Sequence, residues 1–320
     1  MTPLYGETAL DTMVAIVEKG DFAQGGIAVL ATSDGYWDAL TAAGIAGLVD
    51  APILMTPSNE LAVQTSGLLS KLAPETIIVC GGTEALTESV AFEAAKAAGG
   101  AQVVRCAGQT ATGTACAIYE SGAKRTQGEQ LNAARTDVAW ADTALLCTSQ
   151  GYWDALAAAP VSYAKHMPIF LTEDANSVSS QTIETMREGG IKHVYIVGGP
   201  VAISDSVAEA LDRSGISVAD RLWGKTAVET SEAVALFGIE HGMSADNVGV
   251  ATTNGYWDAL SGAPFCGKLG SVIVLVDGER ASTISGFVKS HASDIADVYV
   301  FGGPAAVSVP TRNALRVAAY

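Results

Sequence analysis

The sequence is poor in charged and aromatic residues, and this scarcity excludes several classes of protein. Only 16% of the 320 residues are charged and only 7% are aromatic, whereas 49% are hydrophobic. A disordered chain has the opposite balance, so this chain can bury large cores. The 18 basic residues are outnumbered by 34 acidic ones, which gives a net charge of −16. Nucleic-acid binding requires a basic surface and is therefore not expected.

Cysteine and histidine are also scarce. The chain has five cysteines and four histidines, with no CxxC or zinc-type spacing, so we expect no metal and no cofactor. Whether Cys106 and Cys116 pair is left open. The longest uncharged apolar run near a repeated motif, residues 39–49, is too short to cross a bilayer. No basic segment followed by an apolar one marks a signal peptide at the start of the sequence.

The sequence contains none of the common catalytic fingerprints. There is no GxSxG nucleophile elbow, no HExxH helix, no phosphate-binding GKS or GKT and no GxGxxG dinucleotide motif. Residues with acid–base potential do not recur at corresponding places, apart from one aspartate in a repeated motif. The chain is therefore not expected to be an enzyme.

What the sequence does contain is a hexamer, GYWDAL, that occurs at residues 35–40, 151–156 and 255–260. A glycine and a threonine-containing helix start precede each copy (YGETALDT, AGQTATGT and WGKTAVET). An apolar strand that ends in two glycines follows each copy (IIVCGG, YIVGG and YVFGG), at a distance of 46, 47 and 47 residues from glycine to glycine. The constant order and spacing predict three copies of one structural module.

Each copy alternates apolar strands with helical segments. The strands IAVLAT, APILMT and TIIVC are apolar throughout, which is typical of parallel strands buried on both faces. We therefore predict an α/β fold of three tandem parallel modules, at residues 1–100, 101–215 and 216–320. The opening strand of the first module is expected to be short, because only MTPLYG precedes the first helix. A polar insertion at residues 124–137 is expected to form an exposed loop or helix extension.

GYWDAL is predicted to begin the same helix three times. Its aspartate would lie at the helix N-terminus, where a carboxylate accepts backbone N–H groups and contributes about 0.5–2 kcal/mol. These structural caps are Asp38, Asp154 and Asp258. The preceding tryptophan follows the carboxyl end of a strand, the edge at which open α/β sheets bind ligands. Two roles are open for these indoles, stacking on a sugar ring or sealing an interface between modules: Trp37, Trp153 and Trp257.

The paired glycines are predicted to form tight structural turns, because glycine adopts positive φ without strain. They are Gly81, Gly82, Gly198, Gly199, Gly302 and Gly303. A competing interpretation is an anion site at the N-terminus of the helix that follows. In either case Pro200 and Pro304 fit the first turn of that helix.

The hexamer, the strand after it (APILMT, MPIFLT and SVIVLV) and the Gly-Gly turn together resemble type 2 cell-wall-binding repeats. Such repeats occur in threes in surface and S-layer proteins of Gram-positive bacteria, and the resemblance covers essentially the whole chain. It implies Toprim-like or flavodoxin-like modules packed as a pseudo-threefold trimer. It also implies an extracellular location at the cell wall, non-covalent binding to an anionic, teichoic-acid-like glycopolymer, and a functional domain elsewhere in the full-length protein.

The resemblance further implies which residues bind the polymer. One group is the family's Ile-Leu-Leu strand end, matched approximately by Ile53, Leu54, Met55, Ile169, Phe170, Leu171, Ile273, Val274 and Leu275. The other is the first arginine of an Arg-x-x-Gly-x-x-Arg-Tyr-x-Thr motif, matched by Arg105 and Arg221 but replaced by Pro3 in the first module. The second arginine is alanine in all three copies. An anionic polymer must therefore find other basic groups, and the candidates besides Arg221 are Lys225, Lys124 and Arg125.

The leading hypothesis is a non-catalytic anchoring module, because three equal modules suit a polymer binder that gains from multivalency. One alternative is a structural scaffold of a surface protein, in which the aromatic residues and glycines only hold the modules together. The other is a sugar- or nucleotide-handling enzyme on a Rossmann-like fold. That enzyme would need a deep pocket with converging charged residues in one module.

Overall fold

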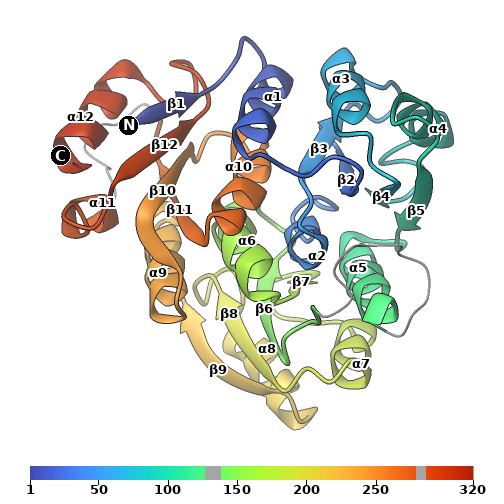
Figure 1. Ribbon diagram of the computed structural model, residues 1–320. Helices are drawn as coiled ribbons and strands as arrows, with labels where there is room; N and C mark the ends of the chain where they lie inside the picture. The colour runs from blue at the N-terminus through green and yellow to red at the C-terminus, as the bar shows by residue number, and fades with distance from the viewer. Residues whose placement is uncertain (127–137, 279–285, 320) are drawn as a thin grey trace.

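The computed structural model describes residues 1–126, 138–278 and 286–319, and it places them in three parallel β-sheets around a central group of helices (Figure 1). Helices and parallel strands alternate along the chain. The predicted architecture of three parallel α/β modules is therefore confirmed. Most of the polar insertion at residues 124–137 lies outside the described residues.

Each sheet has four parallel strands. The first contains, in order, β3 (Ile53–Thr56), β2 (Ile27–Thr32), β4 (Thr76–Cys80) and β5 (Gln102–Cys106). The second contains β7 (Ile169–Thr172), β6 (Thr143–Thr148), β8 (His193–Val197) and β9 (Ser217–Leu222). The third contains β11 (Ser271–Val276), β10 (Ser244–Thr252), β12 (Asp297–Phe301) and β1 (Thr2–Leu4).

The helices connect these strands in the same way in each third of the chain. The first four are α1 (Ala9–Lys19), α2 (Ala42–Val49), α3 (Val63–Leu72) and α4 (Glu88–Ala97). The next four are α5 (Ala111–Thr126), α6 (Trp153–Lys165), α7 (Ser180–Glu188) and α8 (Asp205–Arg213). The last four are α9 (Ala227–Glu240), α10 (Trp257–Lys268), α11 (Gly286–Ser290) and α12 (Val309–Ala319).

The last strand of each sheet comes from the segment that opens the next repeat. Strand β5 pairs with β4, and β9 pairs with β8. The third sheet takes its last strand from the first repeat, because β1 at the N-terminus pairs with β12 near the C-terminus, with Leu4 opposite Phe301 (Figure 1). The sharing of strands between repeats therefore forms a closed ring. Pro3 is tolerated there because β1 is an edge strand. The boundaries 1–100, 101–215 and 216–320 remain our proposal for the repeats.

Each sheet contains at least one strand that is buried throughout, as the uninterrupted apolar strands predict. Every residue of β2, β4, β7 and β11 is buried. The exchanged edge strands β5 and β9 are partly exposed. All five cysteines are buried thiols, so no disulfide joins Cys106 to Cys116. No helix in the described part of the chain is both long and apolar enough to cross a bilayer.

Helices α2, α6 and α10 pack against one another at the centre of the molecule. Alanine and glycine allow this close approach: a β-carbon at Gly47 would lie 2.2 Å from the carbonyl oxygen of Tyr163 on α6. Asp50 follows α2 and accepts hydrogen bonds from the Tyr163 hydroxyl (2.9 Å) and from Nζ of Lys268 (2.8 Å). A single carboxylate thus connects the central helices of all three repeats.

Candidate functional site

The tyrosines of the three GYWDAL copies meet where the repeats converge. The ring centroids of Tyr36, Tyr152 and Tyr256 are 5.3, 5.5 and 5.7 Å apart. Each tyrosine also contacts the tryptophan that follows it, at 4.3–4.5 Å between centroids. The sequence prediction singled out the tryptophans and missed this cluster, although the tyrosine is equally constant in the hexamer.

Two of the tryptophans join one repeat to the next. Trp153 Nε1 and the Tyr152 hydroxyl both donate to the backbone carbonyl of Thr253, at 2.8 and 3.0 Å. Trp257 Nε1 and the Tyr256 hydroxyl donate in the same way to Ser33, at 2.8 and 2.9 Å. The indoles nevertheless stay partly exposed, at 47% for Trp37, 39% for Trp153 and 37% for Trp257. The indole N–H of Trp153 and of Trp257 therefore contributes to an interface between repeats. Stacking of the indoles on a ligand stays a prediction.

The aspartates do not cap the helices, and this part of the prediction is wrong. Tyr152 and Tyr256 occupy the N-cap positions of α6 and α10, so Asp154 and Asp258 lie in the first helical turn. In the first repeat, residues 37–41 form turns and α2 begins only at Ala42. No side-chain capping hydrogen bond is present at α2, α6 or α10.

The aspartates instead face the Gly-Gly turns. A β-carbon at Gly81, Gly198 or Gly302 would lie within 2.6 Å of the carboxylate of Asp38, Asp154 or Asp258, respectively. Burial raises the pKa of Asp154 and Asp258 to about 6. Burial also raises the pKa of Asp38, and a hydrogen bond with Thr114 partly opposes this. Each repeat therefore holds one desolvated carboxyl group against a turn that only glycine can form.

The first glycine of each turn has φ of +108°, +117° or +95°, which strains any other residue. The following helix does not begin directly after the turn, contrary to the prediction for Pro200 and Pro304. Both prolines lie in a further turn. The helices α4, α8 and α12 begin later, at Glu88, Asp205 and Val309. The Gly-Gly turns are therefore separate from the helix N-termini on which the proposed anion site depended.

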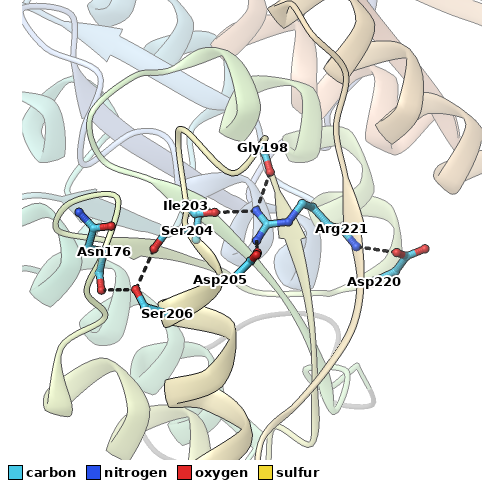
Figure 2. Close-up of polar contacts among 8 residues, drawn as sticks. All are labelled: Asn176, Gly198, Ile203, Ser204, Asp205, Ser206, Asp220 and Arg221. Carbon is cyan, nitrogen blue, oxygen red and sulfur yellow. Dashed lines mark hydrogen bonds and ion pairs between the residues drawn. The ribbon is translucent and has the colours of Figure 1, made fainter.

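The arginines predicted to bind the polymer are engaged with these turns. Arg221 Nη1 donates to the carbonyls of Gly198 (3.0 Å) and Ile203 (2.7 Å), and Nη2 pairs with Asp205 at 3.2 Å (Figure 2). Arg105 Nη1 donates to Gly81 and Gly82, at 2.9 and 3.3 Å. Both guanidinium groups thus satisfy backbone carbonyls of the turn.

The third sheet, whose added strand β1 has Pro3 in place of this arginine, obtains the same contacts from α12. Arg312 donates to the carbonyls of Gly302 and Val307, the counterparts of the carbonyls that Arg221 binds. Its guanidinium also lies 5.5 Å from the ring centroid of Tyr5. No sequence signal marks Arg312, because it comes from a different element and reaches the turn only in the folded chain.

Replacing Arg221 with Met should lower the free energy of unfolding by about 2 kcal/mol, because two carbonyls of the turn lose their donor. Urea denaturation would measure the change. The matched control is Arg213→Met on α8, whose guanidinium makes only an exposed pair with Glu209 at 3.7 Å and should contribute less than about 0.5 kcal/mol. Equal effects of the two variants would contradict a structural role for Arg221.

The Ile-Leu-Leu-type strand ends lie in the core. All nine side chains are buried, with at most 2% of their surface exposed: Ile53, Leu54, Met55, Ile169, Phe170, Leu171, Ile273, Val274 and Leu275. A polymer outside the molecule cannot touch them. The prediction that these side chains contact a polymer is therefore wrong, and their role is to fill the sheets.

Clefts open beside the tryptophans at the carboxyl ends of the strands. The first cleft, of about 600 Å³, is lined by Trp37, Asp38, Gly82, Thr83, Glu84, Ala85, Gly108, Gln109, Thr110, Ala111, Thr114 and Ser149. The second cleft, of about 500 Å³, is lined by Thr148, Gln150, Gly151, Trp153, Asp154, Ala175, Gly199, Pro200, Val201, Ala202, Trp223, Gly224 and Lys225. The hexamer, the Gly-Gly turn and the opening motif of the next repeat thus meet in one place. No group of three or more His, Cys, Asp or Glu residues in the described ranges could hold a metal ion.

Three tandem parallel α/β modules with aromatic clefts at the sheet edges define a class of repeat proteins. The model of the cell wall binding domain 2 family matches residues 4–91, 105–208 and 221–311, and the chain belongs to that family. Family membership places it among the cell-wall-associated proteins of the surface of Gram-positive bacteria, as the repeats predict.

Two proteins of Bacillus subtilis (strain 168) are similar in sequence. N-acetylmuramoyl-L-alanine amidase LytC is 25% identical over 94% of this chain and 55% of its own length. An amidase enhancer is 27% identical over 90% of this chain and 36% of its own length. The chain therefore spans about half of the first relative and a third of the second.

Two solved structures share the fold. Cwp6 from Clostridium difficile has a TM-score of 0.80 at 20% identity, over 98% of this chain and 47% of that one. Cwp8 from Clostridium difficile has a TM-score of 0.79 at 20% identity, over 99% of this chain and 51% of that one.

Proposed function

We propose that this chain is a non-catalytic anchoring module that binds an anionic cell-wall glycopolymer through the clefts beside its tryptophans. The observation that carries the proposal is the repetition of one constellation: a partly exposed indole and a partly buried carboxyl group beside a Gly-Gly turn. Indole faces offer flat apolar contact to sugar rings, and a carboxylate accepts hydrogen bonds from hydroxyl groups. Repetition suits a repeating ligand, because linked weak sites gain avidity.

The aspartates are better explained by ligand binding than by stability. Burial has raised the pKa of Asp154 and Asp258 to about 6, so at neutral pH each carboxylate is held in an unfavourable environment. Desolvated ionisable groups in clefts are typical of functional sites. The arginines Arg105 and Arg221, by contrast, support the turns from behind and are not part of the proposed contact surface.

The composition of the second cleft supports binding without catalysis. Asp154 is the one carboxylate among the described residues that line it. Hydrolysis of a glycosidic bond generally requires a pair of carboxyl groups. We propose that any catalytic activity belongs to another domain of a longer protein, because the amidase LytC extends well beyond the matched region.

The test is a pull-down of the purified chain on cell walls from a Gram-positive bacterium, before and after chemical removal of the phosphate-linked polymers. We expect binding to intact walls and loss of binding after removal. Binding that survives the removal would contradict a phosphate-linked polymer as the ligand. Absence of binding from the start would favour the scaffold alternative, in which the tryptophans only connect the repeats.

A further inference from the structure

We propose that the second cleft is the principal site for the charged unit of the polymer: an anionic sugar ring lies between Trp153 and Trp223, and Lys225 contacts its acidic group. This inference rests on the proposed wall-polymer function. It specifies which cleft binds the negatively charged group of the polymer. The first and second clefts are built alike, and the residues that differ between them favour the second as the site for an anion.

The first difference is a second aromatic wall. The residue before the glycine of the opening motif is Trp223 in the second cleft, whereas the corresponding residue is Ala107 beside the first cleft and Tyr5 in the first copy of the motif. Trp223 is 46% exposed and lines the cleft together with Trp153, from the end of β9. Its ring lies over Gly199, where a β-carbon would come within 2.9 Å of Trp223 Cε3. The second cleft therefore offers indole surface from two different elements.

The second difference is charge. The residue after the same glycine is Gln109 in the first cleft and Lys225 in the second, and it is Glu7 in the first copy of the motif. The first cleft also contains Glu84, where the second has the exposed Val201. In a protein with a net charge of −16, an anionic ligand is repelled from most of the surface. The second cleft has Lys225 on its wall, and Asp154 is the one carboxylate among its described lining residues, whereas the described residues that line the first cleft include Asp38 and Glu84 and no lysine or arginine.

Lys225 is available to a ligand. Its backbone N–H donates to Glu229 Oε2 at 2.6 Å, which fixes the main chain at the start of α9. Its side chain is exposed at the mouth of the cleft. Within residues 1–126, 138–278 and 286–319, no carboxylate pairs with its ammonium group. An ammonium group of this kind attracts phosphate or carboxylate as a point charge.

The test compares affinities for purified Gram-positive cell walls at low and high salt. We expect Trp223→Ala to weaken wall binding at least about tenfold and Lys225→Gln about fivefold, with a smaller salt dependence for the lysine variant. The charge-matched control is Lys96→Gln at the exposed end of α4, which should leave the affinity unchanged. Thermal unfolding would verify that all variants are folded.

Walls treated to remove phosphate and walls with amidated carboxyl groups identify the acidic group. If the difference in affinity between the wild type and Lys225→Gln disappears on one of these walls, the proposal is supported. The acidic group that was removed or neutralised in that wall is then the one that Lys225 contacts. If the wild type binds walls but neither Trp223→Ala nor Lys225→Gln differs from Lys96→Gln, this inference is overturned while wall binding stands. If the wild type binds no walls, both the proposed function and this inference fail.

Discussion

Replacing Asp154 with Asn should raise the free energy of unfolding at pH 7 by up to about 3 kcal/mol. The pKa of this carboxyl rises from 3.8 to about 6 in the folded protein because it is buried. Each pKa unit corresponds to about 1.4 kcal/mol, and the ionised form is the one that burial disfavours. Asn keeps the shape of the side chain and removes the charge. A simple helix cap would give the opposite result, because removing a cap lowers stability.

The pH dependence follows from the same shift. Below pH 3.8 the carboxyl is protonated in both the folded and unfolded chains, and Asp154 has no effect through its charge. Between pH 3.8 and about 6 the folded chain binds the proton more tightly, so the free energy of unfolding falls as the pH rises. Above about pH 6 the full penalty is present. Asp258 behaves in the same way.

Urea denaturation at pH 4.5 and pH 7 measures this directly. The wild type should lose more stability between these two pH values than Asp154→Asn does. The carboxyl groups whose pKa is lowered, such as Asp142 beside Lys192, titrate below this range, and Asp142→Asn is therefore a suitable control. Identical pH dependence in the wild type and Asp154→Asn would mean that the carboxyl is well solvated, and the case for a functional aspartate would be lost.

The architecture could be predicted from the sequence because its signals are local and repeated three times. Uninterrupted apolar strands predict burial on both faces, and β2, β4 and β11 are buried throughout. The pairing of the strands could not be predicted in the same way. That β1 adds to β12, with Leu4 beside Phe301, depends on how the ends of the chain meet in space.

The individual site residues were harder to predict, because a residue type does not show where its donors point. An arginine before a glycine is compatible with polymer binding. In the structure, however, Arg221 donates its hydrogen bonds to the carbonyls of Gly198 and Ile203. The apolar strand ends face the core, since a strand buried on both faces leaves no side for a ligand. The position of Trp153 after the carboxyl end of a strand could be predicted from the sequence, but its hydrogen bond to the carbonyl of Thr253 in another repeat required the structure.

The three repeats are held together mainly by the packing of the central helices α2, α6 and α10. Replacing Gly47 with Ala should disrupt the contact between α2 and α6 and destabilise the protein. The new β-carbon would lie 2.2 Å from the carbonyl oxygen of Tyr163 and 2.6 Å from its Cα. These are backbone atoms of α6, so no rotamer change relieves the clash, and α2 must move away from α6. Overpacking of this kind costs about 3 kcal/mol or more where the backbone has to shift. The hydrogen bond from Tyr163 to Asp50 would be strained as well.

Gly67→Ala on α3 is the matched control, because an added β-carbon there meets no atom within 4 Å. In an open helical position, alanine should stabilise the protein by about 0.5–1 kcal/mol. Thermal unfolding should therefore shift in opposite directions for the two glycines. If Gly47→Ala were as stable as the wild type, the three repeats would tolerate separation, and the interface contacts of Trp153 and Trp257 would have to hold them together without the central helices.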